Sequence, residues 1–219
     1  MIRCQKLTKE FGSPPQRILH SLDIEIKDGE FVSISGKSGS GKSTLLYIIS
    51  TLDSPTQGSV EIDGKNVSQM NSDDVHLFRN KEVGFIFQFH YLLPELTAME
   101  NILLPARNLN CMSEKKDRAN ELLDQLGLSG RGNSYPSQMS GGEQQRIAIA
   151  RALILNPKYI FADEPTGNLD TENAEIVMNL LKQVNQSGTT VCLVTHDPDY
   201  AAMASRAIYL RDGRLASAT

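Results

Sequence analysis

The stretch Gly36-Lys-Ser-Gly-Ser-Gly41-Lys42-Ser43 decides the fold, because it matches the phosphate-binding pattern G-x-x-x-x-G-K-[S/T]. The apolar residues 31–35 before it predict a short buried strand, and the apolar run 44–49 after it predicts a helix. Glycines let the loop backbone curl so that its N–H groups converge, and the following helix adds its positive N-terminal end. The sequence therefore predicts a loop that holds the phosphates of a nucleoside triphosphate.

Two side chains of this loop have specific expected roles. Lys42 would reach the β- and γ-phosphates, and the hydroxyl of Ser43 would ligate Mg²⁺. The full set of residues expected to contact ATP from this loop is Gly36, Lys37, Ser38, Gly39, Ser40, Gly41, Lys42, Ser43 and Thr44.

The composition of the 219 residues fits one domain with a sizeable core. A net charge of −4 gives no electrostatic reason to expect nucleic acid or an anionic lipid surface as a partner. No apolar run approaches the roughly 18 residues that a membrane-spanning helix needs. The three cysteines share no metal or redox spacing, so we expect free thiols in a cytosolic chain that only a partner would hold at a membrane.

The order of the predicted elements indicates an α/β core interrupted by helices. Strand patterns dominate the first ninety residues, and one of them ends in the Asp63-Gly64 turn. Helical signals follow, with Thr97 and Glu100 as a capping box and Ser113 opening a helix that Gly127 stops. We expect a single domain over residues 1–219, with an α/β core of residues 1–88 and 158–219 and a helical subdomain of about residues 89–157.

A pair of carboxylates follows the apolar run 159–162, and alone this is a weak signal, since many buried strands end in acidic residues. In a sequence that also contains a phosphate-binding loop, this pair of carboxylates is a stronger signal of function. Magnesium on phosphates needs a carboxylate at the end of a neighbouring parallel strand, and Asp163 fits that requirement. Glu164 could then polarise the water that attacks the γ-phosphate.

Gln88 and His196 each follow another apolar run, where a polar residue is usually just the end of a strand. In this context Gln88 could contact both the metal and the attacking water. His196 could contact the γ-phosphate and keep the water and Glu164 in place, because imidazole can donate one hydrogen bond and accept another. Both are therefore candidate catalytic residues.

The segment Met139-Ser140-Gly141-Gly142-Glu143 predicts a helix start, with Ser140 and Glu143 as a capping box. A capping box does not explain Gly141 and Gly142, since each costs roughly 1 kcal/mol against alanine in a helix. Bare backbone at a helix N-terminus suits a phosphate. Because the first loop already holds one phosphate site, a second one suggests that two copies meet head to tail and complete each other's sites.

With these motifs in this order the sequence resembles the ABC-type ATPases over nearly its whole length. The resemblance implies an α/β fold of the ABC-type P-loop nucleotide-binding domain, with a RecA-like core, an antiparallel β subdomain and a helical insertion. It implies ATP and Mg²⁺ as ligands, with Ser43, Gln88 and Asp163 at the metal and Glu164, His196 and Gln88 in catalysis. Phe11 would stack on adenine. A second copy would receive Ser140, Gly141, Gly142, Glu143 and, from Gly167-Asn-Leu-Asp170, the side chain of Asp170. Met139 and Glu143 stand where the family usually has Leu and Gln.

Within the family, the run from Phe87 to Asn101, above all Phe89-His90-Tyr-Leu-Leu-Pro94-Glu95, is similar to the ATP-binding subunit of the lipoprotein-releasing (Lol) system. The run 162–170 is typical of the wider group with macrolide-efflux ATPases and the cell-division ATPase FtsE. The resemblance implies membrane permease subunits as partners, lipoprotein cargo, and a place on the cytoplasmic face of the inner membrane. A macrolide-type efflux ATPase or an FtsE-like switch without cargo stays open, whereas soluble ABC proteins of DNA repair or translation are disfavoured.

Overall fold

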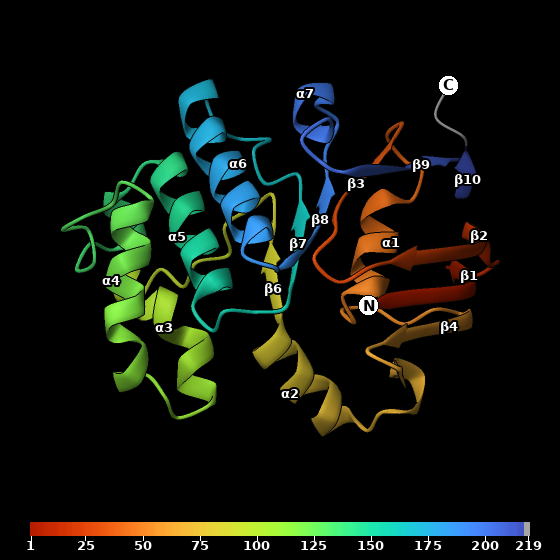
Figure 1. The fold of residues 1–219 in the computed structure, drawn as a ribbon, viewed down its shortest axis with the longest axis horizontal. Coiled ribbons are helices and arrows are strands. Elements are labelled where there is room, and N and C mark those ends of the chain that lie inside the picture. Colours follow the sequence, from red (N-terminus) through yellow and green to blue (C-terminus); the bar gives the residue numbers. More distant parts are fainter. Residues whose placement is uncertain (217–219) are drawn as a thin grey trace. The chain divides into compact units, whose positions relative to one another are not determined.

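The structure, a computed structural model, describes residues 1–216. The chain forms two compact units (Figure 1), one of residues 1–79 with the C-terminal segment from residue 185, and one of residues 80–184. Each unit is described by itself.

The first unit contains an antiparallel sheet in the order β2-β1-β4-β5. Its strands are β1 (Ile2–Phe11), β2 (Gln16–Ile26), β4 (Gln57–Ile62) and β5 (Lys65–Asn66). Ile62 pairs with Lys65, so the β4–β5 loop is Asp63-Gly64, and both residues have positive φ, at 52° and 76°. That two-residue turn suits the twist of an antiparallel pair. The predicted antiparallel β subdomain and its Asp-Gly turn are confirmed.

The same unit holds strands in the order β10-β9-β3-β8, with β3 (Phe31–Gly36) parallel to both β8 (Thr190–Val194) and β9 (Arg206–Arg211). β10 (Arg214–Ala216) pairs antiparallel with β9. Residues 31–35 are all buried, as expected of a parallel strand. Since β3 and β8 run the same way, the loop after β3 and His196 after β8 lie at the same edge of the strands.

Within the described part of the chain, three α-helices belong wholly or mainly to this unit, α1 (Lys42–Ile49), α2 (Ser72–Glu82) and α7 (Pro198–Ala201). α1 follows the phosphate loop as predicted. α2 was not predicted, because none of its residues is buried and its sequence has no apolar face. The signal that could have found it is a cap, since the Asn71 side chain accepts a hydrogen bond from the N–H of Asp74 at 2.8 Å.

The second unit combines two parallel strands with four helices. The strands are β6 (Val83–Ile86) and β7 (Tyr159–Asp163), and the helices are α3 (Ala98–Asn108), α4 (Lys116–Gln125), α5 (Gly141–Leu153) and α6 (Thr171–Gln186). Both predicted capping boxes form, at Thr97 and Ser140. The helical segment opens at Ser113 as predicted, although its first residues, 113–115, form a 3₁₀ turn and the α-helix itself begins at Lys116.

The boundary of this unit differs from the predicted subdomain bounds at 88/89 and 157/158. Strand β6 packs against α5 so closely that a Cβ on Gly84 would lie 2.4 Å from the carbonyl oxygen of Ala152. Strands β6 and β7 therefore belong to the same compact unit as the helices that lie between them in the sequence. The assignment of residues 89–157 as a separate subdomain stays a prediction.

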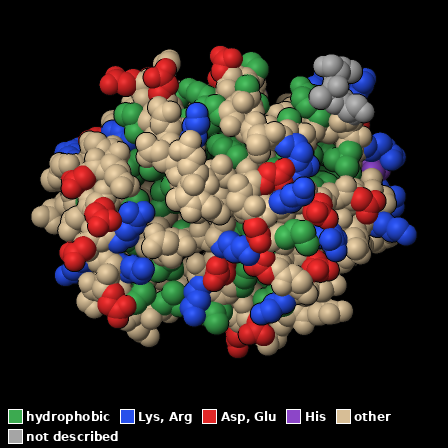
Figure 2. Space-filling view, viewed as in Figure 1, with side chains coloured by type: hydrophobic (Ala, Val, Ile, Leu, Met, Phe, Trp, Pro, Cys, Tyr) green, Lys and Arg blue, Asp and Glu red, His purple; other side chains and the backbone are tan. Residues whose placement is uncertain are grey.

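The surface carries both signs of charge. On the face shown in Figure 2, Lys and Arg side chains are interspersed with Asp and Glu side chains. This mixture agrees with the small net charge. Among the described residues, no helix has the length and apolar character that a membrane span requires.

Candidate functional site

The phosphate loop is closed by two glycines that no other residue could replace without strain. Gly36 has φ 148°, and a Cβ there would lie 2.1 Å from the carbonyl oxygen of Leu210 on the adjacent strand β9. Gly41 has φ 95°, and a Cβ there would lie 2.7 Å from a side-chain carbon of Leu19 on β2. The sequence motif is therefore also a packing requirement, since the loop is pressed between these neighbours.

Helix α1 offers its N-terminal amides at the end of this loop. The N–H of Leu45 donates to the carbonyl of Gly41 at 2.9 Å, so the amides before Leu45 lie ahead of the first such bond. The Lys42 side chain curls back, and its Nζ donates to the carbonyls of Gly36 and Lys37, both at 3.1 Å. An ammonium over a loop of converging amides is a site for phosphate oxygens.

Ser40 is buried within the loop, and its contact with ATP stays a prediction. Its side chain is 3% exposed, and its N–H donates to the Lys37 carbonyl at 3.1 Å. Its carbonyl accepts from the N–H of Gly213 at 3.2 Å. The structure thus gives Ser40 a part in holding the loop, whereas Lys37, Ser38 and Gly39 are exposed.

Of the other candidates in the first unit, Ser43 and Thr44 are half-buried in the first turn of α1, whereas His196 and Phe11 are exposed. His196 follows β8 and precedes Asp197, which caps α7 by accepting hydrogen bonds from two backbone amides. Phe11 ends β1 with 47% of its surface exposed, and the Nζ of Lys9 lies 4.7 Å from its ring centroid. An exposed ring fits stacking on a base, but adenine stacking by Phe11 stays a prediction.

In the second unit, Asp163 is the buried last residue of β7, and Glu164 follows with φ 48°. A positive φ is uncommon for a residue other than glycine, and such backbone strain gathers at functional sites. The turn after Glu164 is closed by a hydrogen bond from the Gly167 N–H to the Glu164 carbonyl at 3.1 Å. The strand and turn therefore place two neighbouring carboxylates in a defined, strained geometry.

Gln88 lies beside this turn, as the parallel pairing of β6 and β7 requires. Its carbonyl accepts a hydrogen bond from the Asn168 side chain at 3.1 Å. A Cβ on Gly167 would come 3.3 Å from the Gln88 side-chain nitrogen. The structure thus brings together Gln88 and the turn that follows Glu164.

Sequence reasoning missed Gln145, a side chain on α5 that is 1% exposed. Its Nε2 donates to the carbonyls of Phe87 and Pro165, both at 3.0 Å, and its Oε1 lies 2.7 Å from the Nδ1 of His90. Arg151, two turns along α5, donates to the carbonyls of His90 and Tyr91. Helix α5 therefore holds both the segment around Gln88 and the turn after Glu164. No local pattern signals these bonds.

At the start of α5 the capping box and Arg131 together take up both oxygens of Glu143. Oε2 accepts from the Ser140 N–H at 2.8 Å, and the Ser140 hydroxyl accepts from the Glu143 N–H at 3.2 Å. Arg131 adds a two-pronged pair, Nε to Oε1 at 3.0 Å and Nη2 to Oε2 at 3.2 Å. The Ser140 backbone hydrogen bond, followed by the charge of Arg131, holds the pKa of Glu143 below its ordinary value.

The two glycines beside it differ. A Cβ on Gly141 would meet nothing within 4 Å, whereas one on Gly142 would lie 3.1 Å from the side chain of Asn173. Asn173 is held by Asp170, whose carboxylate accepts from its N–H and its Nδ2 at 2.8 Å; the N–H bond is the main cause that lowers the Asp170 pKa. A side chain at position 142 would therefore press on Asn173, whereas one at position 141 would meet open space, and binding of a phosphate by either glycine stays a prediction.

The donor atoms predicted for Mg²⁺ are a hydroxyl, a carboxylate and an amide oxygen. This set fits that ion, which prefers oxygen ligands and usually takes only one or two carboxylates besides phosphates and water. Among the described residues there is no group of three or more His, Cys, Asp or Glu that could hold a metal by itself.

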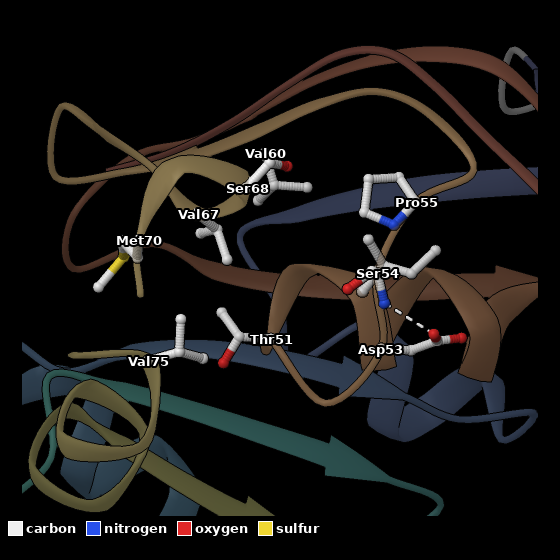
Figure 3. Close-up of a pocket in the computed structure, with 10 residues that line it drawn as sticks. Thr51, Asp53, Ser54, Pro55, Val60, Val67, Ser68, Met70 and Val75 are labelled. Atoms are coloured by element: carbon white, nitrogen blue, oxygen red, sulfur yellow. Dashed lines mark hydrogen bonds between the residues drawn. The ribbon is translucent and has the colours of Figure 1, made fainter. Parts of the chain in front are cut away.

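The first unit also contains a pocket of about 220 Å³ (Figure 3), which none of the predicted nucleotide-binding residues lines. Its walls come from the C-terminal end of α1, the chain after it, β4 and the segment that leads into α2. Asp53 at its edge accepts from the Ser54 N–H at 2.7 Å. The pocket is separate from the phosphate loop.

Comparison with known proteins agrees with this geometry. A family model described as ABC transporter matches residues 19–167. The lipoprotein-releasing system ATP-binding protein LolD of Leptospira interrogans is 53% identical over 212 residues, covering 96% of this chain and 89% of that protein. The macrolide export ATP-binding/permease protein MacB of Neisseria meningitidis is 45% identical over 222 residues, covering 100% of this chain but 34% of that protein.

A solved structure has the same fold. The ATP-binding cassette MJ0796, in a dimeric post-hydrolysis state bound to ADP and Pi, superposes with a TM-score of 0.91. It is 43% identical, and the match covers 99% of this chain and 97% of that one. Since the family model spans more than half of the chain and the fold agrees along nearly all of it, the chain belongs to the ABC transporter family of ATP-binding cassettes.

Proposed function

We propose that this protein is the ATP-hydrolysing subunit of an ABC transport complex that releases lipoproteins from the inner membrane. The observation that carries the ATPase part is the phosphate loop, with its glycines pressed against β9 and β2, the Lys42 ammonium over it and α1 behind it. The MJ0796 cassette, which was captured with ADP and Pi, supports hydrolysis as the reaction.

The proposed roles follow from the chemistry of each side chain. Lys42 and the amides of the loop bind the phosphates, and Phe11 stacks on the base. Ser43, Asp163 and Gln88 hold Mg²⁺, which supplies charge neutralisation on the phosphate oxygens when bound. Glu164 takes the proton of the attacking water, and His196 contacts the γ-phosphate. Hydrolysis removes the γ-phosphate, and this removal is the chemical event that changes the conformation of the complex.

Two copies would bind two ATP molecules, each between the phosphate loop of one copy and Ser140, Gly141 and Gly142 of the other. The dimeric state of the MJ0796 cassette supports this arrangement. The γ-phosphate would bridge both surfaces, so that binding closes the dimer and hydrolysis reopens it. The side chain of Asp170 in that second copy would also contact the ATP, beside the N-terminus of α5.

Lipoprotein release is supported by the identity with LolD, which extends over nearly the whole chain. It is also supported by an exposed apolar segment after β6, where Phe89, Tyr91 and Leu93 are 62%, 62% and 42% exposed. Such a patch suits a protein partner, here the membrane permease subunits. Each methylene of an acyl chain buried in lipid contributes about 0.8 kcal/mol, so extraction of a lipoprotein needs an energy source.

The test is affinity purification of tagged Glu164→Gln from detergent-solubilised membranes of the source cell in ATP. Two related membrane subunits together with lipoproteins are expected to copurify. The same variant with Lys42→Ala added is the matched control, since its ATP binding should be at least about tenfold weaker. Division or cell-wall proteins without lipid-modified cargo would overturn lipoprotein release and favour an FtsE-like switch.

A macrolide-type efflux ATPase is the second candidate, and one observation favours it. The identity with MacB runs along the whole chain, although the chain spans only about a third of MacB. Copurification of permease subunits without lipoproteins, together with raised macrolide sensitivity of cells that lack the chain, would select this function.

A further inference from the structure

Arg131 and Glu143 form a charge pair at the start of α5, within the surface that the proposed function assigns to the partner copy's ATP. The pair uses two N–H groups and both carboxylate oxygens, at 3.0 and 3.2 Å. Glu143 and Arg131 keep 22% and 37% of their side-chain surface exposed. The two side chains are therefore half-buried and in direct contact with each other.

Two anions would meet at the N-terminus of α5, the carboxylate of Glu143 and a phosphate of the partner copy's ATP. A carboxylate in the first helical turn stabilises the positive N-terminal end of a helix. A phosphate that approaches the same end would be repelled by that carboxylate, most strongly in a closed site from which water is excluded. Gly141 leaves the backbone open there, so phosphate and carboxylate would share one small region.

We propose that Arg131 neutralises Glu143 and thereby sets the affinity of this surface for the γ-phosphate of the partner copy's ATP. Glu143 can then serve as the cap of α5 without weakening the nucleotide sandwich. Arg131 acts through Glu143 as a positioning and charge-compensating residue. The inference rests on the proposed head-to-tail dimer.

A purely structural role for Arg131 is the competing explanation. Its Nη2 also donates to the carbonyl of Gln138 at 3.0 Å, which ties the loop before α5 to the pair. Loss of Arg131 could therefore act by loosening that loop. The two explanations predict different effects when the carboxylate is removed as well, because neutralising Glu143 repairs the charge but not the loop.

The experiment measures the ATP concentration that half-saturates dimer formation of Glu164→Gln, followed by size-exclusion chromatography with light scattering. Arg131→Met, Glu143→Gln and the double variant are each introduced into this background. The local charge of the pair is then −1, +1 and 0, against 0 in the parent. Arg107→Met, which removes an exposed arginine from the last turn of α3, is the control for net charge.

We expect Arg131→Met to raise the half-saturating ATP about tenfold, Glu143→Gln to lower it severalfold, and the double variant to return close to the parent. The defect of Arg131→Met should shrink at high salt, as screening of a net charge requires. A double variant as weak as Arg131→Met, or a defect that salt leaves unchanged, overturns the inference. If the parent itself forms no dimer with ATP, the proposed sandwich fails instead, which separates the two claims.

Discussion

Gln145 predicts a large loss of stability from a single buried substitution. Leucine has nearly the volume of glutamine, so Gln145→Leu removes the polar groups of a side chain that is 1% exposed without opening a cavity. The substitution leaves the carbonyls of Phe87 and Pro165 and the Nδ1 of His90 without their partner. The change in stability caused by Gln145→Leu therefore measures the contribution of these hydrogen bonds.

The magnitude is the sum over these three contacts. Each hydrogen bond contributes about 1 kcal/mol net, and an acceptor left unpaired in the interior costs somewhat more, so the loss is about 3 kcal/mol. For a chain of this length, each kcal/mol shifts the melting temperature by roughly 2–4 °C. We therefore expect Gln145→Leu to melt about 6–12 °C below the parent.

Thermal unfolding followed by circular dichroism measures this shift. The matched control is Gln125→Leu, the same change at an exposed position on α4, which should move the melting temperature little. His90→Ala should cost only about 1 kcal/mol, because it removes one of the three contacts. If Gln145→Leu melts within about 2 °C of Gln125→Leu, the hydrogen bonds of Gln145 do not hold this unit together and the reasoning is refuted.

Three further substitutions test the phosphate loop and the charge pair between Arg206 and Glu30. Lys42→Ala should weaken ATP binding at least about tenfold in titration calorimetry, whereas Lys81→Ala should not, and unchanged binding would count against the phosphate loop. Gly36→Ala should destabilise the chain more than Gly39→Ala, since only the first methyl would meet a carbonyl, at 2.1 Å; equal melting temperatures would contradict this. The Arg206 hydrogen bond lowers the pKa of Glu30, so that carboxylate stabilises the fold above about pH 4.3 and loses this contribution as the pH falls through its folded pKa. Urea unfolding should therefore show a deficit of Glu30→Gln at pH 7 that disappears in acid, and a deficit independent of pH would refute the assignment.

Short-range signals made the phosphate loop and the helix starts predictable from the sequence. The glycines of residues 36–43, the capping boxes at Thr97 and Ser140 and the Asp63-Gly64 turn each act within a few residues of themselves. Their physical causes, a required positive φ and an amide without a partner, are local.

The contacts that support the candidate site are long-range, and the sequence did not reveal them. Gln145 bonds to residues 20 to 58 positions away in the chain, and Arg131 pairs with a residue 12 positions away. Helix α2 was missed for a different reason, because a helix without a buried face leaves no apolar period to detect. The packing of Gly142 against Asn173 is likewise a long-range contact, and the predicted role of Gly142 at a phosphate stays a prediction beside it.

The central claim is that the loop binds ATP and that Glu164 takes the proton of the attacking water. It is tested most directly by measuring ATP binding and ATP turnover side by side in the parent and in Glu164→Gln. We expect the variant to bind ATP as the parent does and to have no measurable steady-state turnover. Hydrolysis by Glu164→Gln at the parent's rate would contradict the account, because another group would then have to take that proton.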